Sequence, residues 1–503
     1  MKAQKGSKSR LGMEALMWVL NSERPLHTTE LCHALGVKAG SPDPDPENIP
    51  TIRTLLACAL GLITVEASSS TARLVHFSLK EYLSDNPSLF QSPHSMIAEV
   101  CLTYLNFRCV RELSPTLGSA PSILPLVGYA SSYWGKHVKK GGAGSLAPLA
   151  LKFLIGFEQH ISSRLLLLQY FNDENFWEPD FRTCGPKGFT GLHGAAFFGI
   201  VEIVAALLSK KEWDVNATDT MGRTALAWAA IGGHEDVVEI ILQQEGANAD
   251  IANTGLGLAP LWLAAVCGHE GVVKLLLERE DVYPNTPDTE YGATPLLLAA
   301  ARGHEGVVKF LLKREDINPN TPDTESGRTP LWWTAMSGHE EIAKLLLERE
   351  DIDPNTADTK YGRTPLLLAV KNGHEGVVKL LLERWDINPD IRDLNSETAL
   401  QLAASRGHAR VVELLSAPRP SLPPPTGTDV VPPPDPSSML QNPSQSPPSV
   451  SFPRSKPLPS DTRPLLGKAI GSFVIILSLV FLFYSLAVTG PSLSTISSSA
   501  FHT

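Results

Sequence analysis

The stretch TPLLLAAARGHEGVVKFLL, residues 294–312, decides the fold because it encodes two short helices separated by a tight break. Thr294 is a preferred helix N-cap, Pro295 suits a first helical turn, and Gly303 is typical of a helix end. The apolar run from Val307 to Leu312 predicts the second helix. Neither helix can bury its apolar face alone, so we expect copies of the pair to stack.

Seven copies of this pattern follow one another along the chain. The Gly-His step recurs at intervals of 35, 35, 35, 35 and 34 residues, and a degenerate copy, Gly199-Ile200, lies 34 residues before the first. The histidines of these steps are His234, His269, His304, His339, His374 and His408. A Thr-Pro-Leu-like step stands ahead of each copy. One helical unit repeated at this period predicts an α-solenoid.

These copies resemble ankyrin repeats, and the resemblance covers about Gly188 to Ala417. The histidine that commonly follows Leu in that family is present here only as His193. The other copies have Ala227, Trp262, Leu297, Trp332, Leu367 and Gln401 at this position. We expect these replacements to remove a hydrogen bond between neighbouring repeats and to put apolar packing in its place. The period of 35 exceeds the usual ~33, and the extra residues fall in the loop that enters the next repeat.

The evenly spaced histidines suggest a metal site, but their spacing argues against one. Stacked repeats set equivalent residues ~10 Å apart, whereas zinc needs its ligands at about 2 Å from one centre. We therefore predict structural histidines and no metal. Three tryptophans leave two interpretations open, an exposed aromatic platform or, as we favour, packing between repeats; they are Trp262, Trp332 and Trp333.

The repeat block is acidic, with 20 Lys and Arg against 34 Asp and Glu, a net charge of −14 for residues 188–417. Many of the acids lie in Glu-Arg-Glu-Asp and Pro-Asp-Thr-Glu loops, which we interpret as a solvated face. The ankyrin resemblance implies that a protein partner contacts the loop tips and the concave first helices. Tyr and Arg dominate interface energies, and the predicted partner-binding residues are Tyr291, Arg302, Arg328, Tyr361, Arg363 and Lys371.

The N-terminal third predicts a small α/β-hairpin domain over residues 11–107. We expect helices at 11–20, 28–35 and 49–60, and strands at 62–66 and 73–77 around a Ser-rich turn. Three helices and a hairpin describe a winged helix. Residues 1–187 hold 18 Lys and Arg against 16 Asp and Glu, and the third helix offers only Arg53 to a nucleic acid. We therefore favour a packing role over DNA binding.

Several short motifs here resemble the winged-helix segment that follows the nucleotide-binding NACHT module in fungal ankyrin-bearing STAND proteins. They are Ala15-Leu-Met-Trp18, Arg24-Pro-Leu26, Glu30-Leu31, Gly61-Leu62, Val75-His-Phe-Ser78, Glu81-Tyr-Leu83 and Cys101-Leu-Thr-Tyr-Leu105. Residues 108–187 resemble the helical connector ahead of their repeats. The resemblance implies a relay of nucleotide state, yet the sequence lacks the GxxxxGK[ST] phosphate loop, so we expect no nucleotide cofactor. We expect a truncated relative or a clipped gene model.

The C-terminal end predicts a membrane tether. Residues 418–464 contain 16 prolines and few large apolar residues, so we predict a disordered linker over 418–467. Residues 469–488, AIGSFVIILSLVFLFYSLAV, carry no charge and can cross ~30 Å of hydrocarbon. We predict a transmembrane helix over 468–488 and a short lumenal tail over 489–503; a buried core helix or a wrong gene model is the alternative. Arg463 and Lys468 place the bulk of the chain in the cytosol and favour the endoplasmic reticulum.

Composition and motifs set the functional class. The chain has 503 residues, a net charge of −10 and six cysteines without metal or dithiol spacing, which we interpret as free, buried thiols. It lacks a nucleophile elbow and an HExxH motif, so we predict no enzyme, no cofactor and no small-molecule substrate. We predict a membrane-tethered protein–protein interaction scaffold. The alternatives are a regulator or remnant of a STAND protein and, less favoured, a DNA-associated regulator.

Overall fold

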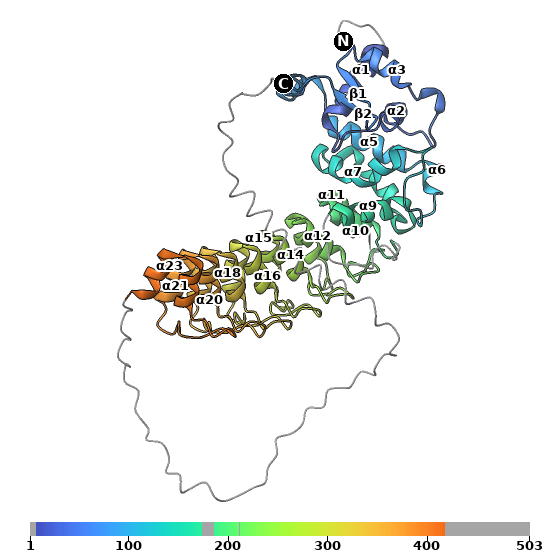
Figure 1. The fold of residues 1–503 in the computed structure, drawn as a ribbon. Coiled ribbons are helices and arrows are strands. Elements are labelled where there is room, and N and C mark those ends of the chain that lie inside the picture. The colour runs from blue at the N-terminus through green and yellow to red at the C-terminus, as the bar shows by residue number, and fades with distance from the viewer. Residues whose placement is uncertain (1–6, 174–185, 211, 418–503) are drawn as a thin grey trace, which may run out of the picture. The chain divides into compact units, whose positions relative to one another are not determined.

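The computed structural model describes residues 7–173, 186–210 and 212–417 (Figure 1). The described residues are mostly helical, as predicted, and contain one two-stranded sheet. Residues 418–503, with the predicted linker, transmembrane helix and tail, lie outside them, as does Cys184. Within the described ranges, no helix is long and apolar enough to cross a membrane. Three free cysteines are buried, whereas Cys109 and Cys267 are partly exposed.

Three helices and a hairpin form at the N-terminal end. They are α1 (Ser7–Asn21), α2 (Thr28–Gly36), α3 (Ile52–Cys58), β1 (Ile63–Glu66) and β2 (Thr71–Leu74). The strands pair antiparallel, with Ile63 opposite Leu74. These element types agree with the prediction, but the second strand ends before residue 77. It ends early because His76 caps α4 (Phe77–Asp85): its Nδ1 accepts a hydrogen bond from the N–H of Ser78 at 3.2 Å. The winged-helix likeness stays a prediction.

Five further helices connect this region to the repeats. They are α5 (Pro93–Leu105), α6 (Arg108–Arg111), α7 (Leu126–Gly141), α8 (Ala147–Leu154) and α9 (Ile161–Asp173). Short 3₁₀ helices lie at η1 (Pro46–Asn48), η2 (Pro87–Leu89), η3 (Gly144–Leu146) and η4 (Phe157–Gln159). Helix α7 is buried along most of its length and packs against α5 and α9. His160, just ahead of α9, bonds through Nε2 to the carbonyl of Leu105 at 3.0 Å, which ties α9 to the end of α5.

Fourteen helices form the seven predicted repeats, two to each. They are α10 (Gly191–Phe198), α11 (Val201–Leu208), α12 (Ala225–Gly232), α13 (Glu235–Leu242), α14 (Pro260–Cys267), α15 (Glu270–Leu277), α16 (Pro295–Arg302), α17 (Glu305–Leu312), α18 (Pro330–Ser337), α19 (Glu340–Leu347), α20 (Pro365–Asn372), α21 (Glu375–Glu383), α22 (Ala399–Arg406) and α23 (Ala409–Ser416).

The fourth repeat shows why this sequence makes a helix pair. The N–H of Leu297 donates to Thr294 Oγ1 at 3.2 Å, which caps α16. The helix ends at Gly303, whose φ of 80° favours glycine. A Cβ at Gly303 would also lie 2.8 Å from the ring of His339 in the next repeat. Glycine is therefore required both by the left-handed backbone and by the close stacking of the repeats.

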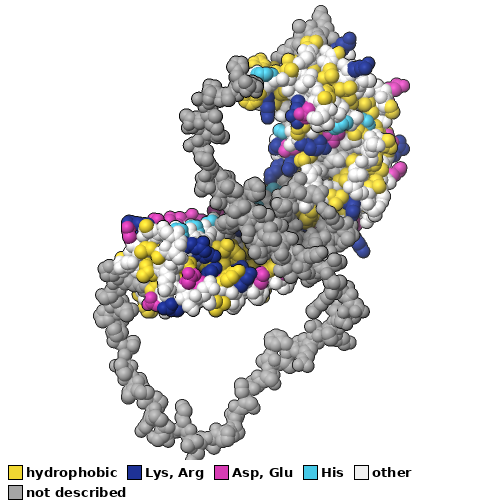
Figure 2. All heavy atoms as spheres, viewed as in Figure 1, with side chains coloured by type: hydrophobic (Ala, Val, Ile, Leu, Met, Phe, Trp, Pro, Cys, Tyr) yellow, Lys and Arg dark blue, Asp and Glu magenta, His cyan; other side chains and the backbone are white. Residues whose placement is uncertain are grey.

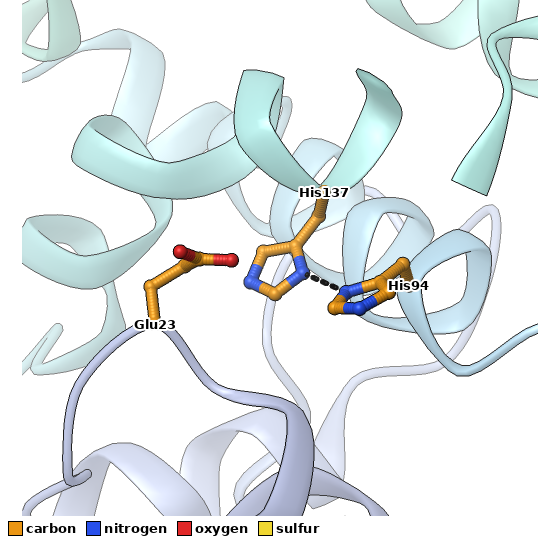
Figure 3. Close-up of side chains that lie close together, drawn as sticks. All are labelled: Glu23, His94 and His137. Atoms are coloured by element: carbon orange, nitrogen blue, oxygen red, sulfur yellow. Dashed lines mark hydrogen bonds between the residues drawn. The ribbon is translucent and has the colours of Figure 1, made fainter. Parts of the chain in front are cut away.

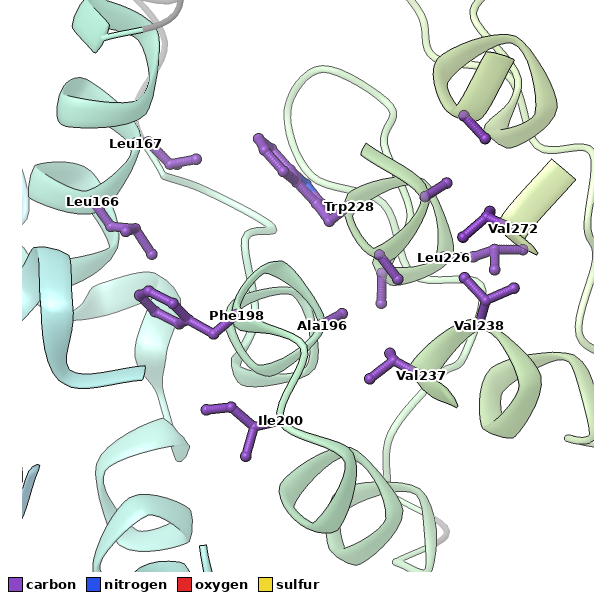
Figure 4. Packing of buried hydrophobic residues seen from close by; sticks show 14 of the residues in the cluster. Leu166, Leu167, Ala196, Phe198, Ile200, Leu226, Trp228, Val237, Val238 and Val272 are labelled. Carbon is purple, nitrogen blue, oxygen red and sulfur yellow. The ribbon is translucent and has the colours of Figure 1, made fainter. Parts of the chain in front are cut away.

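A continuous hydrophobic core joins the N-terminal helices to the repeats, and Figure 4 shows part of it. Trp134 of α7 meets the ring of Phe198 in α10 edge to face, with centroids 5.1 Å apart. Gly135 allows this approach, because a Cβ there would lie 2.1 Å from that ring. Leu166 and Leu167 of α9 are buried near the same interface. The connector therefore covers the first repeat, which a solenoid end requires.

Candidate interaction surface

Each loop between repeats folds around one buried polar side chain. In the fourth repeat, Asp288 Oδ1 accepts hydrogen bonds from the N–H groups of Glu290 and Tyr291, at 3.0 and 2.6 Å, and Oδ2 accepts one from Ala293 at 3.0 Å. The equivalent buried residues are Asp219, Asn253, Asp323, Asp358 and Asp393. The interpretation of the Pro-Asp-Thr-Glu loops as a solvated face is thus wrong for the aspartate, which holds the turn.

The histidines of the Gly-His steps join each repeat to the one before it. His304 Nε2 lies 3.1 Å from the carbonyl oxygen of Val266, and His269 Nε2 lies 2.8 Å from that of Ile231. A carbonyl can only accept, so Nε2 carries the proton in these rings. Burial lowers the pKa of His304, which keeps its imidazole neutral near pH 7. Each of these side chains therefore forms a hydrogen bond between neighbouring repeats.

Two tryptophans stand where the family commonly has a histidine, and they keep its hydrogen bond. His193 bonds through Nε2 to a backbone carbonyl of the next repeat at 3.1 Å. Trp332 Nε1 donates to the carbonyl of Arg363 at 3.0 Å, and Trp262 Nε1 donates to that of Ala293 at 2.9 Å. The prediction that these positions lose the hydrogen bond between neighbouring repeats is therefore wrong for both tryptophans. Trp332 is buried, so it packs between repeats rather than forming an exposed platform.

Four arginines are fully paired within the stack. Arg314 binds both carboxylate oxygens of Asp316, at 2.8 and 2.7 Å, and its Nη1 donates to the carbonyl of Leu277 in the preceding repeat at 2.9 Å. The hydrogen-bonded Asp316 raises the pKa of Arg314. The equivalent residues are Arg279, Arg349 and Arg384. Because most N–H donors of their guanidinium groups already bond within the stack, these arginines have few donors available for a partner.

The structure divides the predicted partner-binding residues into two groups, of which Tyr291 and Arg302 in the fourth repeat form the first. The Tyr291 hydroxyl donates to Glu290 Oε1 at 2.9 Å. Burial, with nearby acids, raises the pKa of Tyr291 to about 12. Arg302 donates through Nη1 to the carbonyl of Val266 at 3.2 Å. Tyr291 thus lies among acids, and Arg302 partly serves the contact between repeats.

The second group lies on repeats 5 and 6, where cations sit over aromatic rings. The Arg328 guanidinium lies over Trp332 and Trp333, 4.7 and 5.1 Å from the ring centroids. Arg363 lies over Tyr361 at 4.8 Å, and Tyr361 is 42% exposed. Rings of this kind attract a guanidinium and hold its plane. Both arginines are therefore held in place at the edge of the surface: Arg328 is partly buried, and the Arg363 side chain is 13% exposed.

Lys371 completes this group. Burial lowers the pKa of Lys371, the positive charges of Arg363 and Arg406 lower it further, and the carboxylates of Asp393 and Asp358 act in the opposite direction. Arg406 is absent from the predicted set. It stands 35 residues after Lys371, one repeat period, and that spacing is the signal by which it could have been found.

We call Arg328, Tyr361, Arg363, Lys371 and Arg406 the basic patch. Figure 2 shows Lys and Arg side chains gathered over α18 and α20, and a row of Asp and Glu along one edge of the repeats. The acidic composition of the repeat block is therefore unevenly distributed over its surface.

A second cluster, in the N-terminal part, brings Glu23, His94 and His137 together (Figure 3). Atoms able to bind a metal ion, one from each residue, lie within 4.8 Å of one another. His94 Nδ1 and His137 Nδ1 are 2.9 Å apart, and His137 Nε2 is 2.8 Å from the Tyr129 hydroxyl. Lys140 Nζ binds Glu23 Oε1 at 2.5 Å, which neutralises the carboxylate that a cation would need.

Hydrogen bonds alone satisfy this cluster. The N–H of Glu23 donates to the Tyr129 hydroxyl at 3.0 Å, so the hydroxyl can donate to His137 Nε2, and His137 Nδ1–H to His94. Burial lowers the pKa of His94 and lowers that of His137 to about 4, so both rings are neutral near pH 7. The chain of bonds ties the end of α1 to α5 and α7, and we assign it a structural role.

Comparison with known proteins agrees with the repeat geometry. Three stretches, residues 151–253, 242–323 and 318–393, match the family model described as ankyrin repeats (3 copies). The first match begins inside α8 and so includes part of the connector.

Three solved structures show similarity at low TM-scores. The ankyrin repeat domain of Bcl-3, described as a unique member of the IkappaB protein family, is 22% identical over 46% of this chain and 100% of that chain, with a TM-score of 0.41. The ankyrin repeat domain of human ASB11 is 24% identical over 45% and 98%, with a TM-score of 0.38. The ankyrin repeat protein EF0377 is 27% identical over 41% and 98%, with a TM-score of 0.36. On the strength of the family match, the helix pairs within residues 151–393 are ankyrin repeats.

Proposed function

We propose that this protein is a non-enzymatic scaffold whose ankyrin repeats bind a protein partner on the basic patch. The observation that carries the proposal is a contrast among the cations of the repeats. Arg314 and its equivalents are paired in the stack, whereas no hydrogen bond from a described residue reaches the Lys371 ammonium. A lysine whose ammonium group the described residues leave without a hydrogen bond, placed beside an exposed tyrosine, is typical of a binding surface.

Cross-linking in cells tests this proposal. The full chain is compared with the double variant Arg363→Glu, Lys371→Glu and with Arg410→Glu as a matched control. Arg410 is exposed on α23 and pairs with Glu413 at 2.7 Å, outside the patch. We expect a cross-linked protein that the double variant loses and the control retains, and that binds the purified full chain in a defined stoichiometry. Equal capture by all three chains would contradict a role for the patch.

We also propose that residues 468–488 tether the scaffold to a membrane, with the endoplasmic reticulum favoured and the repeats in the cytosol. The support is a run of twenty uncharged residues flanked by Arg463 and Lys468. Carbonate extraction with protease protection is applied to the full chain and to a version that ends at Arg463. We expect the full chain in the pellet, with its repeats digestible from the cytosolic side, and the shorter version in the supernatant. If both are extracted, the tether is wrong and the scaffold proposal is unaffected.

A second candidate function is regulation of a NACHT-containing relative through a winged-helix-like domain, residues 11–107, and a connector, residues 108–187. The three helices and hairpin favour it. It predicts co-purification with such a chain that depends on residues before Lys187. The DNA-associated alternative is less favoured because α3 presents only Arg53. Duplex DNA binding with a steep salt dependence would favour it instead.

A further inference from the structure

We infer that the basic patch binds an acidic peptide segment of the partner, an extended chain with Asp or Glu at every third position. The inference rests on the proposed scaffold function and adds the chemistry of what is bound. Its starting point is that Arg328 and Arg363 hold equivalent places in neighbouring repeats, each directly ahead of a Thr-Pro-Leu step. Because the two guanidinium groups are separated by one repeat, they favour a ligand whose carboxylates have the same separation.

Both guanidinium groups retain capacity for a ligand. No described acid forms an ion pair with Arg328, and its Nε is buried without a hydrogen-bond partner. Arg363 is contacted through Nε by Asp393 Oδ2 at 3.4 Å. The other oxygen of Asp393 accepts hydrogen bonds from the N–H groups of Asn395 and Glu397. Asp393 thus forms an ion pair with Arg363 and orients its side chain, which is 13% exposed, and no described residue accepts a hydrogen bond from its Nη groups, a fork whose geometry suits a carboxylate.

The aromatic rings under these arginines lower the entropic cost of binding. Arg328 rests on two indoles and Arg363 on Tyr361, so neither side chain has to be ordered when a ligand arrives. The exposed ring of Tyr361 and the half-buried Trp333 also offer an apolar contact to one side chain of the peptide. The expected ligand therefore combines acids with an apolar or aromatic residue.

The repeat geometry sets the spacing of the acids. Neighbouring helices pack ~10 Å apart, and an extended peptide advances about 3.3 Å per residue. In the polyproline II form, with about 3.1 Å per residue and three residues per turn, every third side chain lies on one face, so carboxylates three residues apart can reach Arg328 and Arg363 together. Lys371 and Arg406 can receive a further acid beside them. In the seventh repeat Glu397 takes the equivalent position, which limits the patch at that end.

Charge favours a short peptide over a nucleic acid. On the face shown in Figure 2, a row of Asp and Glu lies along one edge of the repeats, apart from the Lys and Arg over α18 and α20, and at physiological salt charges more than about 8 Å away are screened. A peptide confined to the basic patch interacts mainly with the cations of the patch. A longer polyanion would extend over the row of Asp and Glu seen in Figure 2, where it would be repelled.

The test is fluorescence anisotropy with the purified full chain and a labelled peptide of about 12 residues that carries Asp at every third position and one Trp. A peptide with Asn in place of each Asp is the matched ligand. We expect the acidic peptide to bind about tenfold more tightly than the Asn peptide, because charge-assisted hydrogen bonds are the stronger kind. Its affinity should also fall as the salt concentration rises.

Variants of the chain locate the site. The double variant Arg363→Ala, Lys371→Ala should weaken binding of the acidic peptide about tenfold. Arg363→Lys keeps the charge and loses the fork, so its Kd should lie between those of the parent and the double variant. Arg410→Ala removes an exposed cation from α23 and should leave the Kd unchanged. Circular dichroism and thermal unfolding verify that each variant is folded.

Three outcomes overturn the inference: equal binding of the two peptides, an equal loss with Arg410→Ala, or tighter binding of a single-stranded oligonucleotide of the same charge. If the acidic peptide does not bind while the cross-linked partner still depends on Arg363 and Lys371, the scaffold proposal stands and the acidic chemistry is wrong. If neither the peptide nor any partner depends on these residues, both proposals fail.

Discussion

The indole Nε1 of Trp332 donates a hydrogen bond of 3.0 Å to the backbone carbonyl oxygen of Arg363, across the boundary between the fifth and sixth repeats. Trp332 is buried, and its N–H also donates to Asp358 Oδ2 at 3.2 Å, while the Arg363 carbonyl accepts a second hydrogen bond from the N–H of Asp358. The bond from Trp332 also holds the backbone from which the Arg363 side chain reaches the surface. A residue of the stack thereby positions a residue of the basic patch.

Replacing Trp332 by Phe should therefore lower the free energy of unfolding and weaken ligand binding together. We expect a loss of about 1 kcal/mol, because the change removes the indole donor that the Arg363 carbonyl and Asp358 Oδ2 share, while that carbonyl keeps the N–H of Asp358. Urea unfolding followed by circular dichroism measures this loss. Trp385→Phe is the matched control, since Trp385 is 73% exposed and its change should stay within about 0.5 kcal/mol. A loss for Trp332→Phe no larger than that of the control would refute the role of the bond.

One loop carries an acid where its neighbours carry an amide. Asn285 Nδ2 donates to the carbonyl of Asp316 in the following loop at 2.6 Å, and Asn320 and Asn355 make the equivalent bond. Asp250 holds this position one repeat earlier, and its Oδ1 is buried without a hydrogen-bond partner. Burial, with the nearby charge of Asp281, raises the pKa of Asp250 to about 6.

Asp250→Asn should raise the free energy of unfolding at pH 7.5 by about 1 kcal/mol, because the amide restores the missing donor. The folded pKa lies above the unfolded one, so protonated Asp250 stabilises the fold at low pH and that contribution is lost as the pH rises through about 6. The gain should therefore shrink at pH 4. Urea unfolding at the two pH values measures it. The reverse change, Asn285→Asp, should destabilise at pH 7.5; the same gain at both pH values would count against this account.

His234 should contribute to the loss of stability in acid. Its Nε2 donates to the carbonyl of Phe197 at 3.0 Å and its Nδ1 lies 3.2 Å from Lys139 Nζ, an arrangement for a neutral ring. Burial, with the charge of Lys139, lowers the pKa of His234 to about 4. Between about pH 6.5 and 4 the unfolded chain binds a proton that the folded chain does not. The free energy of unfolding therefore decreases as the pH is lowered.

His234→Gln should flatten this dependence. The slope of unfolding free energy against pH, measured between pH 6.5 and 4.5, should decrease by the part that one histidine contributes. His76, which is exposed at the cap of α4, provides the comparison through His76→Gln. An unchanged slope in His234→Gln would show that the ring is already charged in the fold.

Gly135→Ala tests the packing of the connector on the first repeat. A Cβ at this position would lie 2.1 Å from Cγ of Phe198, so we expect a loss of about 1–3 kcal/mol from overpacking. The smaller side chain of Phe198→Leu should reduce that loss, and a double-mutant cycle measures the coupling. Gly118→Ala is the control, because a Cβ there meets nothing within 4 Å. Additive effects in the cycle would show that α7 and α10 do not meet as described.

The positions of the repeats could be predicted because their signals are local. The Thr-Pro-Leu and Gly-His steps cap and end helices within a few residues of themselves, so Thr294 and Gly303 bound α16 as expected. The hairpin of the N-terminal part was likewise predicted from alternation and a turn. Its second strand is shifted: it begins at Thr71, two residues before the predicted start, and ends at Leu74, because the capping role of His76 competes with pairing in the strand.

The sequence by itself determined the period, the helix pairs and the residue types presented at the loop tips, because backbone propensities and caps act over single turns. The tertiary structure decided which of those residues are bonded within the stack of repeats and which remain available to a partner. Trp332 reaches a carbonyl 31 residues later, and Arg314 reaches one 37 residues earlier. Such bonds exist only after neighbouring repeats have stacked in register. That register is why Asp288 is buried and Arg314 is paired, and the caps and propensities of single turns carry no information about these contacts.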